Sequence, residues 1–277
     1  MICDSPIYVL PKGAVEKVPV PCGRCPPCKL RRTNSWVFRL MQEEKISTAA
    51  NFVTLTYDTR TVPISPNGYM TLNKRDYQLF MKRLRKLCPD AKLKYYAVGE
   101  YGTTHFRPHY HAIIFNCPDE KLYHEAWGLG AIHVGTVTND SVAYTMKYID
   151  KLSDHKQHQR DDRLREFPLM SKGIGENYIT PAIIQYHNAD ISRLYLTKQG
   201  GHRIALPKYY RQKIYSPDQM KSQVALIQTV VADNENSDRR EHAQLYPADE
   251  ILFDDWQESK KYGRFHKFYN AQNTRDL

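Results

Sequence analysis

Two histidines separated by a single residue, His109 and His111, stand at the start of an apolar run that ends at Phe115. Runs of this length that are rich in isoleucine and aromatic residues predict a β-strand. Because side chains i and i+2 of a strand project from the same face, the two imidazoles are expected to lie side by side. Such a pair can chelate a divalent cation. The alternative is two unrelated strand histidines, and so short a pattern does not separate the two interpretations.

A glycine-flanked carboxylate, Glu100, ends another expected strand over residues 93–99. If this strand pairs antiparallel with the histidine strand through a hairpin over 103–108, Glu100 falls beside His109 and His111. Two imidazoles and one carboxylate leave positions open on Mg²⁺ or Mn²⁺ for substrate oxygens and water. An ordinary exposed loop acid is the alternative for Glu100.

Two tyrosines one helical turn apart, Tyr144 and Tyr148, lie downstream in a segment with helical periodicity. Aliphatic residues supply the apolar stripe of that helix, so the tyrosines share the other side with Lys147 and Lys151. A tyrosine hydroxyl has a pKa of about 10 and is a weak nucleophile at neutral pH. A metal that polarises a phosphodiester, with a lysine that offsets developing charge, would assist its attack on phosphorus. Packing tyrosines are the alternative.

The product of that attack would be a phosphotyrosine ester. Because the ester keeps the bond energy of the cleaved strand, a 3′-hydroxyl can later reverse the step. The chemistry is then cleavage and rejoining rather than hydrolysis. A second neighbouring tyrosine would permit another cleavage while the first still holds a DNA end.

Periodicity predicts the elements that have to position these groups. Apolar and aromatic runs indicate strands, whereas amphipathic segments indicate helices. Both strands and helices are therefore expected in the chain. The expected strands are 51–57, 93–99, 110–115 and 131–137, and the expected helices are 74–87, 119–127, the tyrosine segment and 218–232.

A cluster of cysteines precedes these elements. Cys22, Cys25 and Cys28 form a C-x-x-C-x-x-C run on a proline-stiffened turn, and Cys3 is the simplest candidate for a fourth ligand. Clustered thiols outside a secreted context indicate metal ligands before disulfides. Four thiolates suit a tetrahedral structural zinc, although an iron–sulfur cluster also favours such spacing and free thiols remain an alternative. Cys88 and Cys117 have no partner nearby in the sequence and are expected to be structural.

The charge balance favours a polyanionic partner. The chain has 40 Lys and Arg against 30 Asp and Glu, a net charge of +10. Basic side chains would contact phosphates and give affinity without sequence information, although a solvated basic face is the common alternative. The 20 tyrosines offer stacking surfaces for unpaired bases. The candidate DNA-binding residues are Arg24, Lys29, Arg31, Arg32, Lys82, Arg83, Arg85, Lys86 and Lys151.

These motifs together resemble a known family. The order is the cysteine run 22–28, the strand 52–57, the turn 99–102, His109-Tyr110-His111 and then Tyr144-x-x-Lys147-Tyr148. It is similar to that of HUH rolling-circle replication initiators. More narrowly, it resembles the replication initiation proteins of gokushovirus-type microviruses, which are small single-stranded DNA bacteriophages.

The resemblance implies an α+β fold with a central antiparallel five-stranded sheet of the HUH endonuclease or RRM-like type, with flanking helices and an N-terminal cysteine metal knuckle. It implies origin nicking through a covalent 5′-phosphotyrosine and later joining of single strands. His109 and His111 would be metal ligands, with Glu100 as the third. Tyr144 and Tyr148 would be the nucleophiles, in an order left open, and Lys147 the auxiliary cation.

Three segments are expected along the chain. Residues 1–45 form the cysteine-rich arm with its zinc, 46–152 the catalytic core, and 153–277 an extension packed on the core with a DNA-binding role. No stretch is apolar enough to span a membrane, and no signal peptide is evident. The expected location is therefore the cytoplasm of an infected bacterium, with single-stranded and origin DNA as partners and a host helicase as a further candidate.

Other classes of function compete with this interpretation. A plasmid-type initiator or an HUH transposase would use the same chemistry, but the cysteine cluster and the two tyrosines favour the phage type. A non-catalytic zinc-containing DNA-binding protein would bind DNA without forming a covalent adduct. A metal-dependent hydrolase of small molecules would have no need for basic helices or paired tyrosines.

Overall fold

The computed structural model divides into two compact units, which are described separately. One unit is Trp36–Tyr178, and the other combines Met1–Ser35 with Ile179–Leu277. The structure describes residues 3–10, 13, 15–137, 158–198, 201–247 and 250–273.

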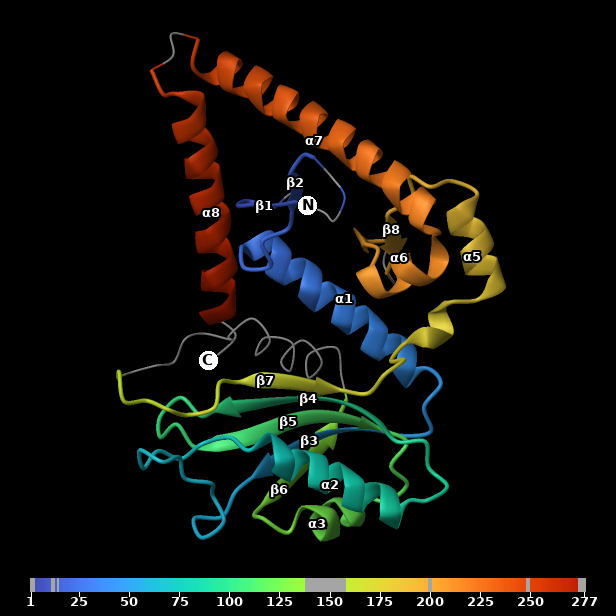
Figure 1. Ribbon diagram of the computed structural model, residues 1–277, viewed down its shortest axis with the longest axis vertical. Helices are drawn as coiled ribbons and strands as arrows, with labels where there is room; N and C mark the ends of the chain where they lie inside the picture. The colour runs from blue at the N-terminus through green and yellow to red at the C-terminus, as the bar shows by residue number, and fades with distance from the viewer. Residues whose placement is uncertain are drawn as a thin grey trace. The chain divides into compact units, whose positions relative to one another are not determined.

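A five-stranded antiparallel sheet forms the centre of the first unit, which confirms the expected α+β class (Figure 1). Its order is β6-β3-β5-β4-β7, so β5 is the middle strand and β6 and β7 are the edges. The sequence predicted four of these strands and did not locate β7. The bounds are β3 (Ala50–Thr56), β4 (Lys94–Tyr101), β5 (Pro108–Phe115), β6 (Ile132–Thr136) and β7 (Phe167–Met170).

One face of the sheet is covered by two helices, α2 (Lys74–Leu87) and α3 (Lys121–Trp127). α2 begins where the side chain of Asn73 accepts a hydrogen bond from the Arg75 backbone N–H, as expected of an N-cap. Its apolar residues recur at helical spacing, so one stripe is buried against the strands and the basic residues stay outside. The fully buried residues of α2 are Tyr77, Phe80, Met81 and Leu84.

The other face is apolar at one end and polar at the other. At the apolar end, Leu40 of α1 (Pro26–Glu44) and Ile174 pack with Tyr96, Val98 and Ile113 of the sheet. The polar end begins directly beside this cluster, where Val98 pairs with His111, and it also carries Glu100 and His109. One face of the sheet is therefore packed against helices, and the other carries both apolar and polar side chains.

A glycine turn closes the apolar end. Gly173 and Gly175 both have φ of 70°, a left-handed conformation that favours glycine. Glu43, which is buried, accepts hydrogen bonds from the Gly175 backbone N–H at 2.8 Å and from Lys94 Nζ at 2.8 Å. A short helix, η1 (Glu176–Tyr178), follows the turn. The turn thus binds a carboxylate of its own unit through its backbone.

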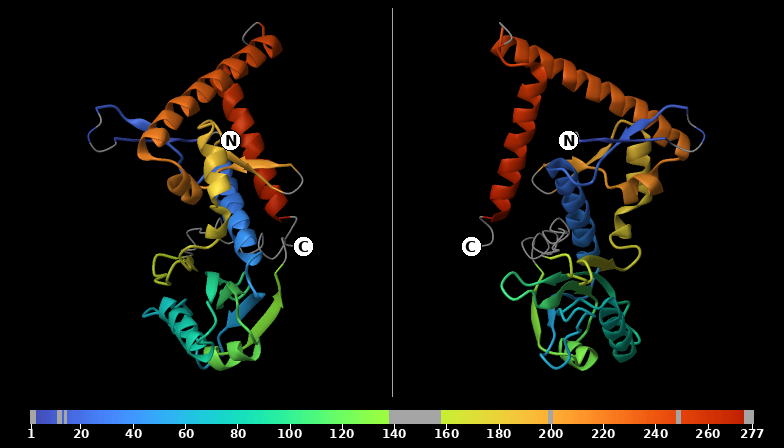
Figure 2. Two further views of the ribbon diagram at one scale, coloured as in Figure 1. Left: turned by 90° about the vertical axis from the view of Figure 1, so that its right-hand side faces the viewer. Right: turned by 60° about the vertical axis from the view of Figure 1, so that its left-hand side comes forward.

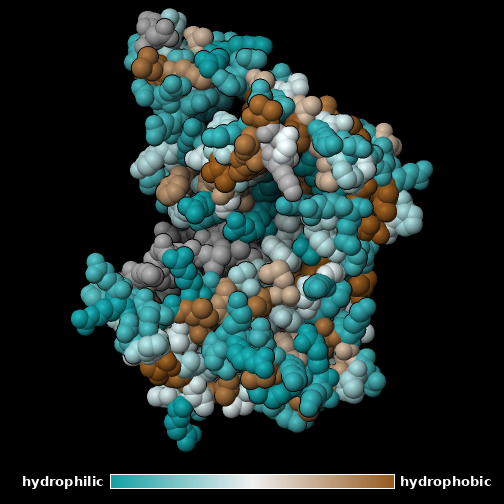
Figure 3. Space-filling model, viewed as in Figure 1, coloured by the Kyte–Doolittle hydropathy of each residue, from teal (hydrophilic) through white to brown (hydrophobic). Residues whose placement is uncertain are grey.

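The second unit consists of a hairpin, a small α/β segment and two long helices. Ile7, Val9 and Leu10 of the hairpin are exposed, and Figure 3 shows hydrophobic side chains on the surface of this unit. The helix expected over 218–232 extends further, as α7, and starts with a capping box between Ser216 and Gln219. The elements are β1 (Ile7–Val9), β2 (Val18–Val20), α5 (Pro181–Asn188), β8 (Tyr195–Thr197), β9 (Arg203–Ala205), α6 (Lys208–Ile214), α7 (Pro217–Leu245) and α8 (Phe253–Asn273).

The last helix contacts the N-terminal arm within this unit. Lys29 Nζ donates to the hydroxyl of Tyr269 at 3.0 Å, and Arg264 pairs with Asp4 at 2.6 Å. Figure 2 shows α7 and α8 meeting at one end. Among the described helices, none has the length and apolarity needed to cross a membrane.

Candidate functional site

The strand register brings the predicted metal ligands together. β4 and β5 pair antiparallel so that Glu100 lies opposite His109 and Val98 lies opposite His111. Side chains of directly paired residues share a face, and alternation along β5 puts both imidazoles on it. The hairpin predicted from the sequence is therefore confirmed, and Tyr110 points to the opposite, helix-covered face, where it is fully buried.

Glu100 lies between the two imidazoles. Its Oε1 is 2.6 Å from His109 Nε2 and 3.1 Å from His111 Nε2. One donor atom from each of the three residues lies within 4.8 Å of the other two. Three donors of two chemical types thus converge on one point of the sheet.

The second nitrogen of each imidazole also has a partner. His109 Nδ1 is 3.1 Å from the backbone oxygen of Arg107, and His111 Nδ1 is 3.0 Å from Thr54 Oγ1. Phe52 stacks on the ring of His111 with an interplanar angle of 14°. These contacts direct both Nε2 atoms toward Glu100. Orientation of a metal-ligating histidine through its other nitrogen is a common feature of metal sites.

The charges of the three groups reinforce one another. Burial alone would raise the pKa of Glu100, but hydrogen bonds from His109 and His111 hold it below its usual value. Burial would lower the pKa of His109, but the hydrogen bond to Glu100 and the neighbouring Arg107 carbonyl raise it. His109 therefore faces an acceptor at both ring nitrogens, an arrangement that suits the protonated imidazolium.

The donor set fits a divalent cation. Glu100 is 4% exposed, and its Oε2 is buried without a hydrogen-bond partner among the described residues. A buried carboxylate oxygen in that state loses solvation unless a cation binds it. Two imidazoles and one carboxylate are ligands that Mg²⁺ or Mn²⁺ can share with water and substrate oxygens.

Two residues at the site were missed by the sequence analysis. Thr54 could have been found, because alternation along the expected strand 51–57 puts it on the face opposite to its buried neighbours Val53 and Leu55. Glu166 had no signal in the sequence, since it precedes the unpredicted strand β7. Its Oε1 accepts a hydrogen bond from the backbone N–H of Tyr101 at 3.2 Å.

The proposed nucleophiles and the two lysines beside them lie outside the described residues; these are Tyr144, Lys147, Tyr148 and Lys151. Their roles stay predictions from the sequence.

The basic helix α2 lies on the opposite face of the sheet from the predicted metal ligands. Its four candidate DNA-binding residues are all exposed, and Arg83 also donates to the backbone oxygens of Ala126 and Trp127 at 2.5 and 3.1 Å. Arg83 thereby satisfies carbonyls at the C-terminal end of α3, where a cation is favourable. Phosphate contact by α2 stays a prediction.

The basic residues near the cysteines are partly engaged within their own unit. Arg32 donates to the backbone oxygen of Gly23 at 2.8 Å, and Lys29 contacts Tyr269. Arg24 is exposed, and Arg31 is half-buried. DNA contact by these four residues also stays a prediction.

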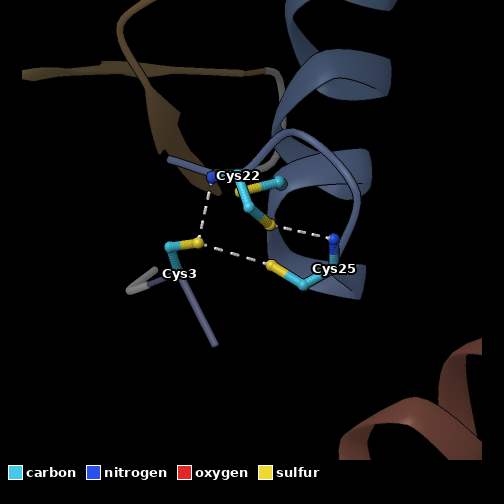
Figure 4. Close-up of side chains that lie close together, drawn as sticks. Cys3, Cys22 and Cys25 are labelled. Atoms are coloured by element: carbon cyan, nitrogen blue, oxygen red, sulfur yellow. Dashed lines mark hydrogen bonds between the residues drawn. The ribbon is translucent and has the colours of Figure 1, made fainter. Parts of the chain in front are cut away.

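The four cysteines predicted as metal ligands form a second cluster, in the other unit. Their sulfur atoms all lie within 4.8 Å of one another, and Cys3 Sγ is 3.7 Å from Cys25 Sγ (Figure 4). Four thiolates at about 2.3 Å from a tetrahedral zinc stand about 3.8 Å apart. Backbone N–H groups also point at sulfur, from Cys22 to Cys3 at 3.3 Å and from Cys25 to Cys22 at 3.3 Å. The cluster therefore has the geometry of a tetrathiolate metal site.

The thiols differ in their ease of ionisation. Burial opposes ionisation of Cys22, but hydrogen bonds from the backbone of Arg24 and Cys25 lower its pKa to about 6. Burial, together with the neighbouring thiols of Cys25 and Cys3, raises the pKa of Cys28 to about 12. A bound cation would supply the charge needed to ionise all four thiols.

Cys88 and Cys117, distant in the sequence, are neighbours in space. Both are buried, and the pKa of Cys88 is raised to about 11 by burial and by the Cys117 thiol. Both belong to the hydrophobic core beneath α2, in agreement with the predicted structural role.

Comparisons with known proteins agree on one family. Residues 50–153 match the model of the Replication-associated protein ORF2 family. The chain is 30% identical over 232 residues to Replication-associated protein ORF2 of Spiroplasma virus 4, covering 76% of this chain and 72% of that protein. It is 31% identical over 216 residues to Replication-associated protein VP4 of Bdellovibrio phage phiMH2K, covering 69% and 66%. It is 25% identical over 237 residues to Replication-associated protein ORF4 of Chlamydia phage 1, covering 72% and 55%. No solved structure matches the chain.

Proposed function

The chain belongs to the Replication-associated protein ORF2 family, and we propose that it nicks viral DNA at the origin to start rolling-circle replication. The observation that supports this proposal is the convergence of Glu100, His109 and His111 on one face of the sheet. In a protein of viral replication, a divalent-cation site of this type is suited to phosphodiester chemistry. The proposed enzyme is a metal-dependent single-strand endonuclease with joining activity.

Three residues would hold the catalytic cation. His109 and His111 would bind Mg²⁺ or Mn²⁺ through Nε2, and Glu100 through its carboxylate. When bound, the cation would polarise the scissile phosphate and offset the charge that develops on its oxygens. Thr54 and the Arg107 carbonyl would keep the imidazoles oriented, because each contacts the nitrogen turned away from the cation.

The nucleophile would be Tyr144 or Tyr148, with Lys147 as the auxiliary cation. The tyrosine oxygen would attack phosphorus, the 3′-oxygen would leave, and a 5′-phosphotyrosine ester would remain. The order of the strands supports this assignment. The tyrosines lie in the chain between β6 and β7, the two opposite edges of the sheet. α2 and α3 already cover the face that lacks the metal ligands.

The cysteine cluster would hold a structural zinc. Cys3, Cys22, Cys25 and Cys28 supply four thiolates and leave no open coordination position, as expected of a structural site. An iron–sulfur cluster is the other occupant compatible with four cysteines. Either would join the N-terminal arm to the first turn of α1.

The proposal also assigns roles to the three segments of the chain, its partners and its location. Residues 1–45 would form the metal knuckle, 46–152 the nuclease core and 153–277 a DNA-binding extension packed on it. The partners would be single-stranded and origin-containing viral DNA, with a host helicase as a further candidate, in the cytoplasm of the infected bacterium. The exposed basic residues Lys82, Arg85 and Lys86 would contribute affinity through phosphates rather than sequence preference.

The test is the formation of a covalent adduct. The full chain is incubated with single-stranded origin DNA labelled at its 3′ end and Mn²⁺, with and without chelator, and resolved on a denaturing protein gel. We expect a labelled protein band that requires the metal, persists in each of Tyr144→Phe and Tyr148→Phe at reduced yield, and is absent from the double variant.

Two results would contradict the proposal. An adduct that persists in the double variant would remove the tyrosines from their assigned role. Tight binding to origin DNA with no adduct under any metal condition would favour a zinc-containing DNA-binding protein instead.

A further inference from the structure

The second half of α8 combines basic and aromatic side chains without any acid. The acids of α8 lie at its beginning, at Asp254, Asp255 and Glu258, and none occurs from there to Asn273. Between residues 260 and 269 four Lys or Arg side chains are interspersed with four Tyr or Phe side chains. These are Lys260, Lys261, Tyr262, Arg264, Phe265, Lys267, Phe268 and Tyr269.

Three of the aromatic rings form a stripe along one side of α8. Tyr262, Phe265 and Tyr269 recur at i, i+3 and i+7, the spacing of a single helical face. Tyr262 is 64% exposed and Phe265 is 47% exposed, whereas Tyr269 is half-buried. Each exposed ring leaves apolar area in water, and covering that area would be favourable. The stripe is therefore suited to a partner that also has flat apolar faces.

Lysines from two segments of the chain stand at the two ends of this stripe. Lys261, which is exposed, precedes Tyr262 and is the i−4 neighbour of Phe265 on the helix surface. At the other end, Lys29 Nζ donates to the hydroxyl of Tyr269 at 3.0 Å and lies 5.2 Å from the centroid of its ring. Lys29 belongs to the basic run 22–39, which contains no acid. A positive potential thus extends along the aromatic stripe.

The remaining cations of α8 show how the helix is fixed. Lys260 pairs with Asp238 and Glu241 of α7 at 2.9 and 3.1 Å, and Arg264 pairs with Asp4 at 2.6 Å. These pairs use up the charges of two α8 cations and leave Lys261 with no acidic partner among the residues that the structure describes.

We propose that this surface binds single-stranded DNA, with bases stacked on the rings of Tyr262 and Phe265 and phosphates held near Lys261 and Lys29. Aromatic side chains stack on any base, and a basic groove or stripe follows the backbone. A duplex keeps its base faces covered unless bases are unstacked at a cost, so the surface should prefer unpaired strands. The inference rests on the proposed function in taking viral single-stranded DNA as the partner, but it does not involve the Glu100 centre.

A protein groove or a lipid surface suits this helix less well. Helices that dock by an apolar face, or that lie on a membrane, use aliphatic side chains for much of the buried area. From Asp254 to Asn273 the chain has no Leu, Ile, Val or Met. The large apolar side chains in this part of α8 are all aromatic, which favours stacking on bases.

The experiment compares two DNA ligands with matched variants of the full chain. Fluorescence anisotropy in chelator measures binding to a labelled oligothymidine and to a labelled duplex of equal length. The double variant Tyr262→Leu/Phe265→Leu keeps the apolar character and removes the rings. We expect it to bind oligothymidine about tenfold or more weakly, since each stacked base contributes at least about fivefold, while duplex binding stays within about twofold. Tyr262→Trp/Phe265→Trp should retain the wild-type affinity.

Charge variants and a control complete the design. Lys261→Gln should weaken binding to both ligands alike and lower the salt dependence by about one unit, as expected of a phosphate contact. Tyr186→Leu is the matched control, because Tyr186 is 46% exposed and lies on α5, which contacts the first turn of α7 rather than α8. It should bind both ligands as the wild type does.

The outcomes separate this inference from the proposed nuclease. Unchanged oligothymidine affinity in the Leu double variant, or an equal loss on the duplex, would overturn the stacking role and leave the metal-dependent adduct to be judged by its own assay. Binding to phosphatidylglycerol vesicles that depends on the two rings, with oligothymidine affinity unchanged, would assign the surface to lipid instead. Ring-dependent oligothymidine binding by a wild-type protein that forms no adduct would support this surface and contradict the nuclease.

Discussion

The two candidate metal centres of this protein are built in opposite ways. The cysteine cluster is largely local, since three of its four ligands come from Cys22 to Cys28, and it presents four soft donors. The Glu100 centre is assembled by pairing of two strands and presents three harder donors. A closed set of four ligands suits a structural role, whereas three ligands leave room for a substrate. The two centres should therefore fail differently when each is damaged.

The largest effect is expected at the histidines. His111→Ala removes one of the three proposed metal ligands and also the partner of Thr54. We expect no detectable covalent adduct, while binding to single-stranded DNA, measured by fluorescence anisotropy in chelator, stays within about twofold because phosphate contacts supply most of that affinity. His109→Ala should behave alike.

A comparison variant guards against a folding artefact. His133→Ala removes an exposed histidine of β6 in the same sheet. If His133→Ala lost the adduct as completely as His111→Ala, the effect could not be assigned to the metal ligands.

A cysteine variant should show the reverse pattern. Cys22→Ser removes one of four thiolates, so bound zinc, measured by plasma mass spectrometry, should fall from about one per chain to near zero. The N-terminal arm should then become sensitive to protease, because metal binding supplies much of the folding free energy of such knuckles. Adduct formation on a short single-stranded substrate should persist.

The control for this prediction is the buried pair outside the cluster. Cys117→Ser should leave the zinc content unchanged, since Cys117 packs in the core near Cys88. Iron instead of zinc in the wild-type protein would assign the cluster to the iron–sulfur alternative. Loss of the adduct in Cys22→Ser would show that the two centres are not independent.

The two centres also differ in which of their residues could be predicted from the sequence. The meeting of His109, His111 and Glu100 was predictable because alternation along strands and a short hairpin fix which side chains meet, and the pairing of β4 with β5 confirms that they are neighbours. Spacing alone predicted that Cys22, Cys25 and Cys28 lie together, whereas Cys3 was only the simplest candidate for a fourth member. The helix over 74–87 was located to the residue because its apolar stripe is a strong local signal.

The parts that were missed depend on contacts between distant segments. β7 is a four-residue edge strand whose sequence has no clear alternation, so neither it nor Glu166 could be placed beside Glu100. The position of α2 relative to the ligands depends on which face of the sheet it covers, and its own sequence does not say so. Arg83, one of several similar basic residues, is distinguished only by the α3 carbonyls that it meets.

A smaller effect is expected from pH. In the metal-free protein the pKa of His109 is raised above its ordinary 6.5 and that of Glu100 is lowered. Cation binding requires neutral His109, so Mn²⁺ affinity should fall by up to about tenfold per pH unit as the pH drops through the raised pKa. Calorimetry between pH 6 and 8.5 measures this, and affinity that does not change over that range would contradict the proton competition.

The folding stability that His109 gives the metal-free protein should fall as the pH rises, whereas Mn²⁺ affinity should increase. A raised pKa means that the His109–Glu100 contact stabilises the folded protein fully below pH 6.5 and that this stabilisation is lost as the pH rises through the folded pKa. Glu100, with a lowered pKa, contributes above its ordinary 4.5 and loses its contribution as the pH falls through its folded value. Chelated protein should therefore become less stable between neutral and alkaline pH, where the metal-bound protein should not.

The smallest effect is expected from Thr54, which contacts the centre but carries no charge. Thr54→Val keeps the β-branched shape that suits β3 and removes only the hydroxyl 3.0 Å from His111 Nδ1. We expect Mn²⁺ affinity to fall by about tenfold, the low end of the range for partners of this kind, with adduct yield restored at high Mn²⁺. Thr56→Val is the matched control, because Thr56 Oγ1 donates to the backbone oxygen of Ala131 and not to a ligand. Equal losses in the two variants would mean that β3 affects the centre through sheet stability rather than through the orientation of His111.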